Sequence, residues 1–235
     1  MSLWQEGAEP YASPNRNARR DGLTPHLVVL HHTAMETAEA ALARLADPQA
    51  QPTPVSVHYV IAEDGRLWQM VPEAERAWHA GLGHWAGQDD INSRSIGIEL
   101  ANPAPNPFAE PQMARLERLL PQILARWAIP PEGVIAHSDM APTRKADPGP
   151  KFDWRRLALQ GLSIWPDPGA VDSDAPLAQS LARIGYPLAD PAAAFAAFRM
   201  RFRPWAQGHE EAEDRRIAAD LARRFPARPG PGAQG

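Results

Sequence analysis

The chain has 235 residues, of which 44% are hydrophobic and 22% charged, and its formal net charge is −4. The negative charge argues against a nucleic-acid partner, since phosphate contacts need clustered Lys and Arg, and no apolar run reaches the ~18–20 residues that span a bilayer. The absence of cysteine excludes disulfides, thiol nucleophiles and thiolate metal sites, which leaves chemistry carried by His, Asp, Glu, Lys and hydroxyl groups.

The first part of the chain alternates predicted strands and helices. His26–His32 is apolar and β-branched at its centre, which favours a buried strand. Glu36–Asp47 has Ala and Leu at helical spacing behind an acidic first turn, which indicates a helix. Val55–Ala62 and Arg66–Val71 flank a Glu-Asp-Gly turn, so they predict a β-hairpin.

Three more elements follow. Ser95–Leu100 alternates, with Ile96, Ile98 and Leu100 on one face, and predicts a strand. Glu110–Trp127 has apolar residues at helical spacing and predicts a long amphipathic helix despite an internal proline. Val134–His137 is a further short strand. This order predicts an α/β (α+β) fold with a central mixed β-sheet flanked by helices.

The composition changes after residue 168, where a linker rich in Pro, Gly and Asp ends. Three short segments rich in Ala, Leu and Arg follow, at Pro176–Ile184, Pro191–Phe202 and Glu210–Phe225. Each is too short to be stable alone, so the three must pack on one another or on the preceding domain. We therefore expect a first domain at 1–168, a small three-helix domain at 169–229 and a disordered tail at 230–235.

Candidate functional residues lie at strand ends and in one proline-rich loop. His31 and His32 end a strand and point to opposite faces, so only one can serve a given site. His137 ends another predicted strand, and Asp147 follows it by ten positions. Two imidazoles and one carboxylate with an open fourth position make a suitable catalytic zinc set. An isolated His at a strand end is, however, more often a structural residue, and the spacing alone does not decide between the two.

Five blocks of sequence carry a family resemblance. In chain order they are 29–34 (VLHHTA), 56–59 (SVHY), 73–81 (EAERAWHAG), 92–100 (NSRSIGIEL) and 134–150 (VIAHSDMAPTRKADPGP). Together they resemble the zinc-dependent N-acetylmuramoyl-L-alanine amidases of the type-2 group, which is related to the peptidoglycan recognition proteins. The resemblance covers residues from about 27 to 165. The helical segments behind it are similar, more loosely, to a three-helix peptidoglycan-binding module.

The resemblance implies a Zn²⁺ cofactor and roles for five residues. His31, His137 and Asp147 match the zinc ligands of the family. His31 is preferred to its neighbour His32 because the family ligand directly follows the aliphatic residues of the strand. Residues 1–168 would then form a zinc amidase catalytic domain.

Glu99 and Lys145 match the catalytic glutamate and lysine of the family. Glu99 lies on the polar side of its strand next to Gly97, and partial burial there would raise its pKa toward the working pH of a general base. Lys145 would stabilise the oxyanion formed when water attacks an amide carbonyl. Without the resemblance, a half-exposed glutamate and a solvated lysine are the simpler interpretations.

Further polar residues lie in the matched blocks and are candidate substrate-binding residues: His32, His58, His79, Asn92 and Arg94. The alternative roles of the histidines are to orient the metal ligands or to pack in the interior, and the alternative for Asn92 and Arg94 is hydrogen bonding within their loop.

The resemblance implies hydrolysis of the amide bond between N-acetylmuramic acid and L-alanine in peptidoglycan or its muropeptide fragments. One alternative is a non-catalytic fragment-binding protein, against which the complete ligand set argues. Another is a zinc peptidase that acts within the stem peptide. The first eleven residues contain no signal-peptide pattern, so we expect a cytoplasmic protein, with the periplasm as the alternative. We also expect the protein to be a monomer.

Overall fold

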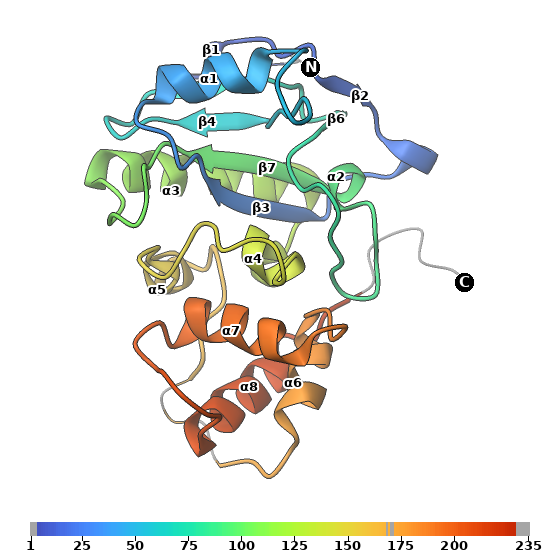
Figure 1. The fold of residues 1–235 in the computed structure, drawn as a ribbon, viewed down its shortest axis with the longest axis vertical. Coiled ribbons are helices and arrows are strands. Elements are labelled where there is room, and N and C mark those ends of the chain that lie inside the picture. Colours follow the sequence, from blue (N-terminus) through green and yellow to red (C-terminus); the bar gives the residue numbers. More distant parts are fainter. Residues whose placement is uncertain (1–3, 168, 170–171, 229–235) are drawn as a thin grey trace.

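The fold is a mixed β-sheet with helices on both faces and three further helices at one end (Figure 1). The computed structural model describes residues 4–167, 169 and 172–228. The main sheet has the strand order β1-β5-β4-β7-β3-β8. Its strands are β1 (Glu9–Pro10), β3 (Leu27–His32), β4 (Tyr59–Ile61), β5 (Leu67–Gln69), β7 (Ser95–Leu100) and β8 (Val134–Ala136). A small second sheet pairs β2 (Arg16–Ala18) with β6 (Glu75–Ala77).

The centre of the sheet is parallel. Strand β3 pairs in parallel with β7 on one side and with β8 on the other, whereas β4 and β5 form the predicted antiparallel hairpin. In parallel strands the carboxyl ends lie at the same edge of the sheet, so the residues that end β3, β7 and β8 come close together.

Helix α3 (Glu110–Trp127) covers one face of the sheet. Its buried side chains share a cluster with Val28 and Leu30 of β3 and with Ile96, Ile98 and Leu100 of β7. The predicted apolar face of β7 is thereby confirmed. Because side chains alternate along a strand, the last residues that point away from α3 are His31 on β3 and Glu99 on β7.

Helix α1 (Ala38–Ala46) packs beside β4, where Leu42 and Leu45 share a cluster with Val60. The Thr37 hydroxyl accepts a hydrogen bond from the Ala40 amide and so begins the helix two residues later than predicted.

The three C-terminal helices are α6 (Leu177–Ile184), α7 (Pro191–Phe202) and α8 (Ala212–Arg224). They pack on one another as expected, and their apolar cluster continues into the first part of the chain, where it includes Val29, Ile135 and Met140. Figure 1 shows α7 beside the short helix α4 (His137–Met140). The hydrophobic core therefore runs without a break across the predicted boundary at residue 168.

The expectation for His137 needs a correction, because this residue does not end a strand. Strand β8 stops at Ala136, and His137 is the first residue of a short helix. The Asp139 carboxylate accepts a hydrogen bond from the Ala136 amide and so closes this turn. The structure also contains short helices that the sequence did not predict: α2 (Ile91–Arg94), α4 (His137–Met140), α5 (Trp154–Leu159), η1 (Arg20–Gly22) and η2 (Pro131–Gly133).

The predicted tail at 230–235 lies outside the described residues. Within the described part of the chain, the helices lack the length and apolar character needed to cross a bilayer.

Candidate metal centre

Three side chains meet at the carboxyl edge of the sheet. His31 Nδ1 lies 2.9 Å from His137 Nδ1 and 3.0 Å from Asp147 Oδ2, and His137 Nδ1 lies 2.9 Å from the same oxygen. A tetrahedral zinc ion with bonds of about 2.0–2.1 Å separates its ligand atoms by about 3.3 Å. The three atoms are thus a few tenths of an ångström closer together than such an ion requires.

Hydrogen bonds around His31 fix which of its nitrogens carries the proton. The Ser95 hydroxyl donates to the Ile91 carbonyl at 2.6 Å, so its oxygen accepts from His79 Nε2 at 3.2 Å. His79 Nδ1 must then accept from His31 Nε2, 2.9 Å away. This assignment leaves an unprotonated Nδ1 on His31, directed toward the other two side chains.

His137 is oriented in the same way. Its Nε2 donates to the Ala80 carbonyl at 3.1 Å, so in the neutral ring the lone pair is on Nδ1. Two imidazole lone pairs and a carboxylate oxygen thus face one another, which is unfavourable unless a cation lies between them. Burial, and then the neighbouring His137, lower the pKa of His31 to about 4, which favours the neutral imidazole that metals bind. The residues present therefore fit a divalent metal ion.

Glu99 lies beside His31 in register on the adjacent strand. Its Oε2 is inaccessible to water and has no hydrogen-bond partner in the described part of the chain. Burial, with a further contribution from the charge of Asp147, raises the pKa of Glu99 to about 8, and the charge of Lys145 opposes this rise. Lys145 itself is exposed in the loop that carries Asp147.

Gly97 makes room for the ring that orients His31. A Cβ atom at position 97 would lie 2.5 Å from Cγ of His79, well inside van der Waals contact. The space beside Gly97 is therefore filled by the ring of His79, whose contact with His31 corresponds to the ligand-orienting role that was one of the alternatives for this histidine.

Other candidate residues hold the surrounding loops. His32 Nδ1 donates to the Pro148 carbonyl at 3.1 Å, next to Asp147. His58 is completely buried, and its Nδ1 accepts from the Gly97 amide while its Nε2 donates to the Glu75 carbonyl. Burial, and then the charge of a nearby arginine, lower the pKa of His58 to about 3.

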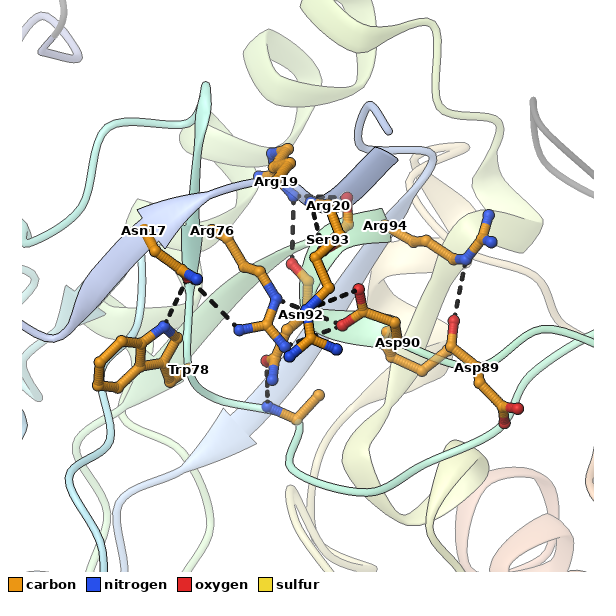
Figure 2. A network of polar contacts seen from close by, with 12 residues as sticks. Asn17, Arg19, Arg20, Arg76, Trp78, Asp89, Asp90, Asn92, Ser93 and Arg94 are labelled. Carbon is orange, nitrogen blue, oxygen red and sulfur yellow. Dashed lines mark hydrogen bonds and ion pairs between the residues drawn. The ribbon is translucent and has the colours of Figure 1, made fainter. Parts of the chain in front are cut away.

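Figure 2 shows a network of polar contacts that includes Arg19, Asn92 and Arg94. Asn92 Oδ1 accepts hydrogen bonds from the amides of His79 and Ala80. Arg94 Nε donates to the Asp89 carbonyl at 2.9 Å. Both side chains thus make the loop contacts that were the alternative to substrate binding.

Arg19 is a part of this network that sequence reasoning missed. Its guanidinium donates to the carbonyls of Glu73, Asn92, Ser93 and Ser95, so it ties the entry of β7 to the chain before β6. Arg19 lies before the first matched block, where no pattern in the sequence indicates this role. Beside the network opens a groove of about 960 Å³, lined in part by Leu82, Asn92 and Arg144.

Comparison with known proteins identifies the family. Residues 21–150, more than half of the chain, match the N-acetylmuramoyl-L-alanine amidase family. The chain belongs to this family. The predicted resemblance and the predicted enzyme class are thereby confirmed, and the matched segment contains all five residues that the resemblance singled out as ligands or catalytic groups.

Individual amidases are similar over most of the chain. The N-acetylmuramoyl-L-alanine amidase AmiD of Escherichia coli is 37% identical over 85% of this chain and 83% of its own. Its structure has a TM-score of 0.77 at 36% identity and covers 90% of this chain and 94% of that one. The structure of AmpDh3 from Pseudomonas aeruginosa has a TM-score of 0.78 at 30% identity and covers 91% of this chain and 97% of that one. These likenesses confirm the predicted fold class.

The share of this chain that each relative covers indicates which of them extend into the C-terminal helices. The 1,6-anhydro-N-acetylmuramyl-L-alanine amidase AmpD of Escherichia coli is 35% identical but covers only 66% of this chain, although it is matched over 93% of its own length. The AmiD structure leaves out 10% of this chain, which is fewer residues than α6 to α8 contain. The amidases with additional chain length therefore share at least part of these helices.

Proposed function

We propose that this protein hydrolyses the amide bond between N-acetylmuramic acid and L-alanine with a Zn²⁺ ion held by His31, His137 and Asp147. The observation that carries the proposal is the meeting of two imidazole lone pairs and one carboxylate oxygen within 3.0 Å, in a chain of the amidase family. When bound, zinc supplies a Lewis acid that polarises a carbonyl group and acidifies water.

Glu99 acts first as general base and then as general acid. Its buried, unpartnered Oε2 takes a proton from the water that attacks the lactyl carbonyl carbon. The raised pKa of Glu99 allows it to hold that proton until the amide C–N bond breaks. The proton then passes to the departing amine of L-alanine, and the carboxylate is restored. The charge of Lys145 lowers the pKa of Glu99 and so favours the ionised form that begins the cycle.

Lys145 stabilises the oxyanion that develops on the attacked carbonyl. It lies in the same loop as Asp147, and its backbone amide donates to the Ala141 carbonyl at 3.0 Å, which fixes the start of this loop. Its exposed ammonium group is free to approach a substrate from the open side of the site.

Muropeptide fragments are the substrate class that we propose. The structures of AmiD and AmpDh3 were solved with anhydro-N-acetylmuramic acid-L-Ala-D-γ-Glu-L-Lys and with anhydromuramic pentapeptide, respectively, which supports this choice. The groove beside the Arg19 network, which Leu82, Asn92 and Arg144 help to line, has room for a stem peptide. Substrate contacts by His32, His58, His79, Asn92 and Arg94 stay predictions.

The proposal is tested with purified, zinc-loaded protein and two substrates, an anhydromuropeptide and intact peptidoglycan. Mass spectrometry should detect a free peptide that begins with L-alanine and a sugar without peptide. Shortened peptides that keep the sugar on alanine would indicate a peptidase instead, and binding without turnover would indicate a binding protein. Comparison of the two substrates measures the preference for fragments.

The compartment and the oligomeric state stay predictions. Fractionation of cells that express the full native gene product distinguishes the cytoplasm from the periplasm. Light scattering on the purified protein tests the expectation of a monomer. Binding of the isolated peptidoglycan by an inactive variant tests whether α6 to α8 contact the cell wall.

A further inference from the structure

The backbone around His137 is held by contacts from the C-terminal helices. Strand β8 ends one residue before His137, and α4 begins with His137 itself. The position of its Nδ1 therefore depends on how the end of the strand and the first turn of the helix are fixed. No other secondary-structure element lies between them to absorb a displacement.

Asp139 fixes the first turn of α4 from a completely buried position. Its Oδ2 accepts a hydrogen bond from the Ala136 amide at 2.9 Å, so this hydrogen bond closes the turn that contains His137. A carboxylate away from water is strongly unfavourable unless it is paired and hydrogen-bonded. Asp139 can hold this place only with compensating donors.

The compensating donors come from the C-terminal helices. Arg201 on α7 donates from Nη1 to Asp139 Oδ2 at 2.5 Å, and Tyr186, just after α6, donates from its hydroxyl to Oδ1 at 2.7 Å. The side chain of Arg201 is only 2% exposed, and its guanidinium lies 4.1 Å from the centre of the Trp154 ring. The ion pair is thus enclosed between the two parts of the chain.

Arg201 also contacts the strand that leads to His137. Its Nη2 donates to the Val134 carbonyl at 3.0 Å and to the Ser163 hydroxyl at 3.1 Å. One guanidinium therefore fixes the start of β8 directly and the end of β8 through Asp139. Displacement of this guanidinium would free both ends of the three-residue strand.

We propose that Arg201 and Tyr186 are positioning residues for the metal centre, which act through Asp139 to hold His137 where its Nδ1 meets the other two ligands. This inference rests on the proposed zinc site. It assigns the C-terminal helices a part in metal binding that is separate from any contact with the cell wall.

A second buried ion pair on the same helix provides a matched control. Arg199 pairs with Asp214 of α8, with side chains 8% and 0% exposed. Its other hydrogen bonds go to the carbonyls of Gly208 and His209, and its guanidinium lies 4.3 Å from the centre of the Phe195 ring. Arg201→Met and Arg199→Met each remove one arginine from a buried carboxylate, so both should lower stability. Only Arg201→Met removes a contact with α4 and β8.

The readouts are the Zn²⁺ affinity, measured by competition with a chelator, and the visible spectrum of the Co²⁺-substituted protein. Both are measured at a temperature where circular dichroism shows each variant to be folded. Arg201→Met should lower the affinity about 10–100-fold and alter the Co²⁺ spectrum. Arg199→Met should keep an affinity and a spectrum near those of the wild type.

Equal losses in the two variants, or an unchanged affinity in Arg201→Met, overturn the inference. If Arg201→Met does not fold, Tyr186→Phe decides, because it removes only a hydroxyl group. This variant should lose affinity several-fold, and wild-type affinity with a wild-type spectrum would refute the proposed role. A wild-type protein that binds no Zn²⁺ would instead refute the metal centre itself, so the two failures are distinguishable.

Discussion

Replacement of Glu99 by Gln tests both the proposed chemistry and the energetic cost of the site. The pKa of Glu99 is raised from 4.5 to about 8, chiefly by burial and then by the charge of Asp147. The folded protein therefore binds this proton more tightly than the unfolded chain does. Below the unfolded pKa both states carry the proton and the cost is absent. As the pH rises toward 8 the unfolded chain loses its proton first, so the folded state loses stability across this window.

The structure gives the size of the effect. At 1.36 kcal/mol per pKa unit, the whole shift corresponds to about 4–5 kcal/mol. Glu99 is only partly buried, and solvent reduces the effect, so we expect a change in the free energy of unfolding of about 1–3 kcal/mol. Because Gln does not ionise, metal-free Glu99→Gln should be more stable than the wild type by this amount above pH 8. Near pH 4.5 the two proteins should be nearly equal.

Urea unfolding of the metal-free proteins at several pH values checks this expectation. Glu63→Gln, in the exposed turn between β4 and β5, is the matched control and should show no such trend. The zinc-loaded Glu99→Gln protein should keep its metal but lose hydrolysis about 10²–10⁴-fold. A stability difference that does not change with pH would refute the buried, raised-pKa description, and full activity would remove Glu99 from the mechanism.

Three further substitutions, at Gly97, His31 and Phe198, test the metal centre and the shared core. Gly97→Ala should weaken Zn²⁺ binding about 10–100-fold, because the added Cβ would lie 2.5 Å from His79 Cγ and force the ring away from His31. Metal titration of this variant, of His79→Ala and of the double variant checks this. If the losses of affinity in the two single variants simply add in the double variant, Gly97 does not act through His79. After dialysis, His31→Ala should contain far less than one zinc ion per chain when its metal content is measured. One ion per chain in this variant would mean that the ligands lie elsewhere. Phe198→Ala removes a completely buried ring from the shared cluster and should cost about 3–5 kcal/mol of unfolding free energy in urea; two separate unfolding transitions would argue against one core.

The predictable part of the fold consists of elements with a strong repeating pattern. Strand β3, the β4–β5 hairpin and helix α3 appear where apolar periodicity places them. Helix α4 has four residues and therefore too little length for a period. Its start is set by Asp139, whose pairing with Arg201 joins residues 62 positions apart. A contact of that range has no local signature.

The candidate site was predictable from the family resemblance rather than from spacing. His31 and His137 are 106 positions apart, and no rule of periodicity selects this pair among eight histidines. The alternation of Ser95–Leu100 correctly separated two faces, but without the resemblance it left a half-exposed Glu99 as the simpler interpretation. Both faces of β7 are instead covered, one by α3 and the other by the ring of His79 at Gly97.

The unbroken core between the sheet and the last three helices limits how the gene can be divided. A fragment that stops at residue 167 would leave Val29, Ile135 and Met140 without the neighbours that cover them, and such a product is expected to precipitate rather than work as a smaller enzyme. Transfer of α6 to α8 to another protein would likewise expose the apolar side chains that now pack against the first part of the chain. A cavity-creating mutation in this shared cluster is therefore expected to destabilise the sheet and the last three helices together.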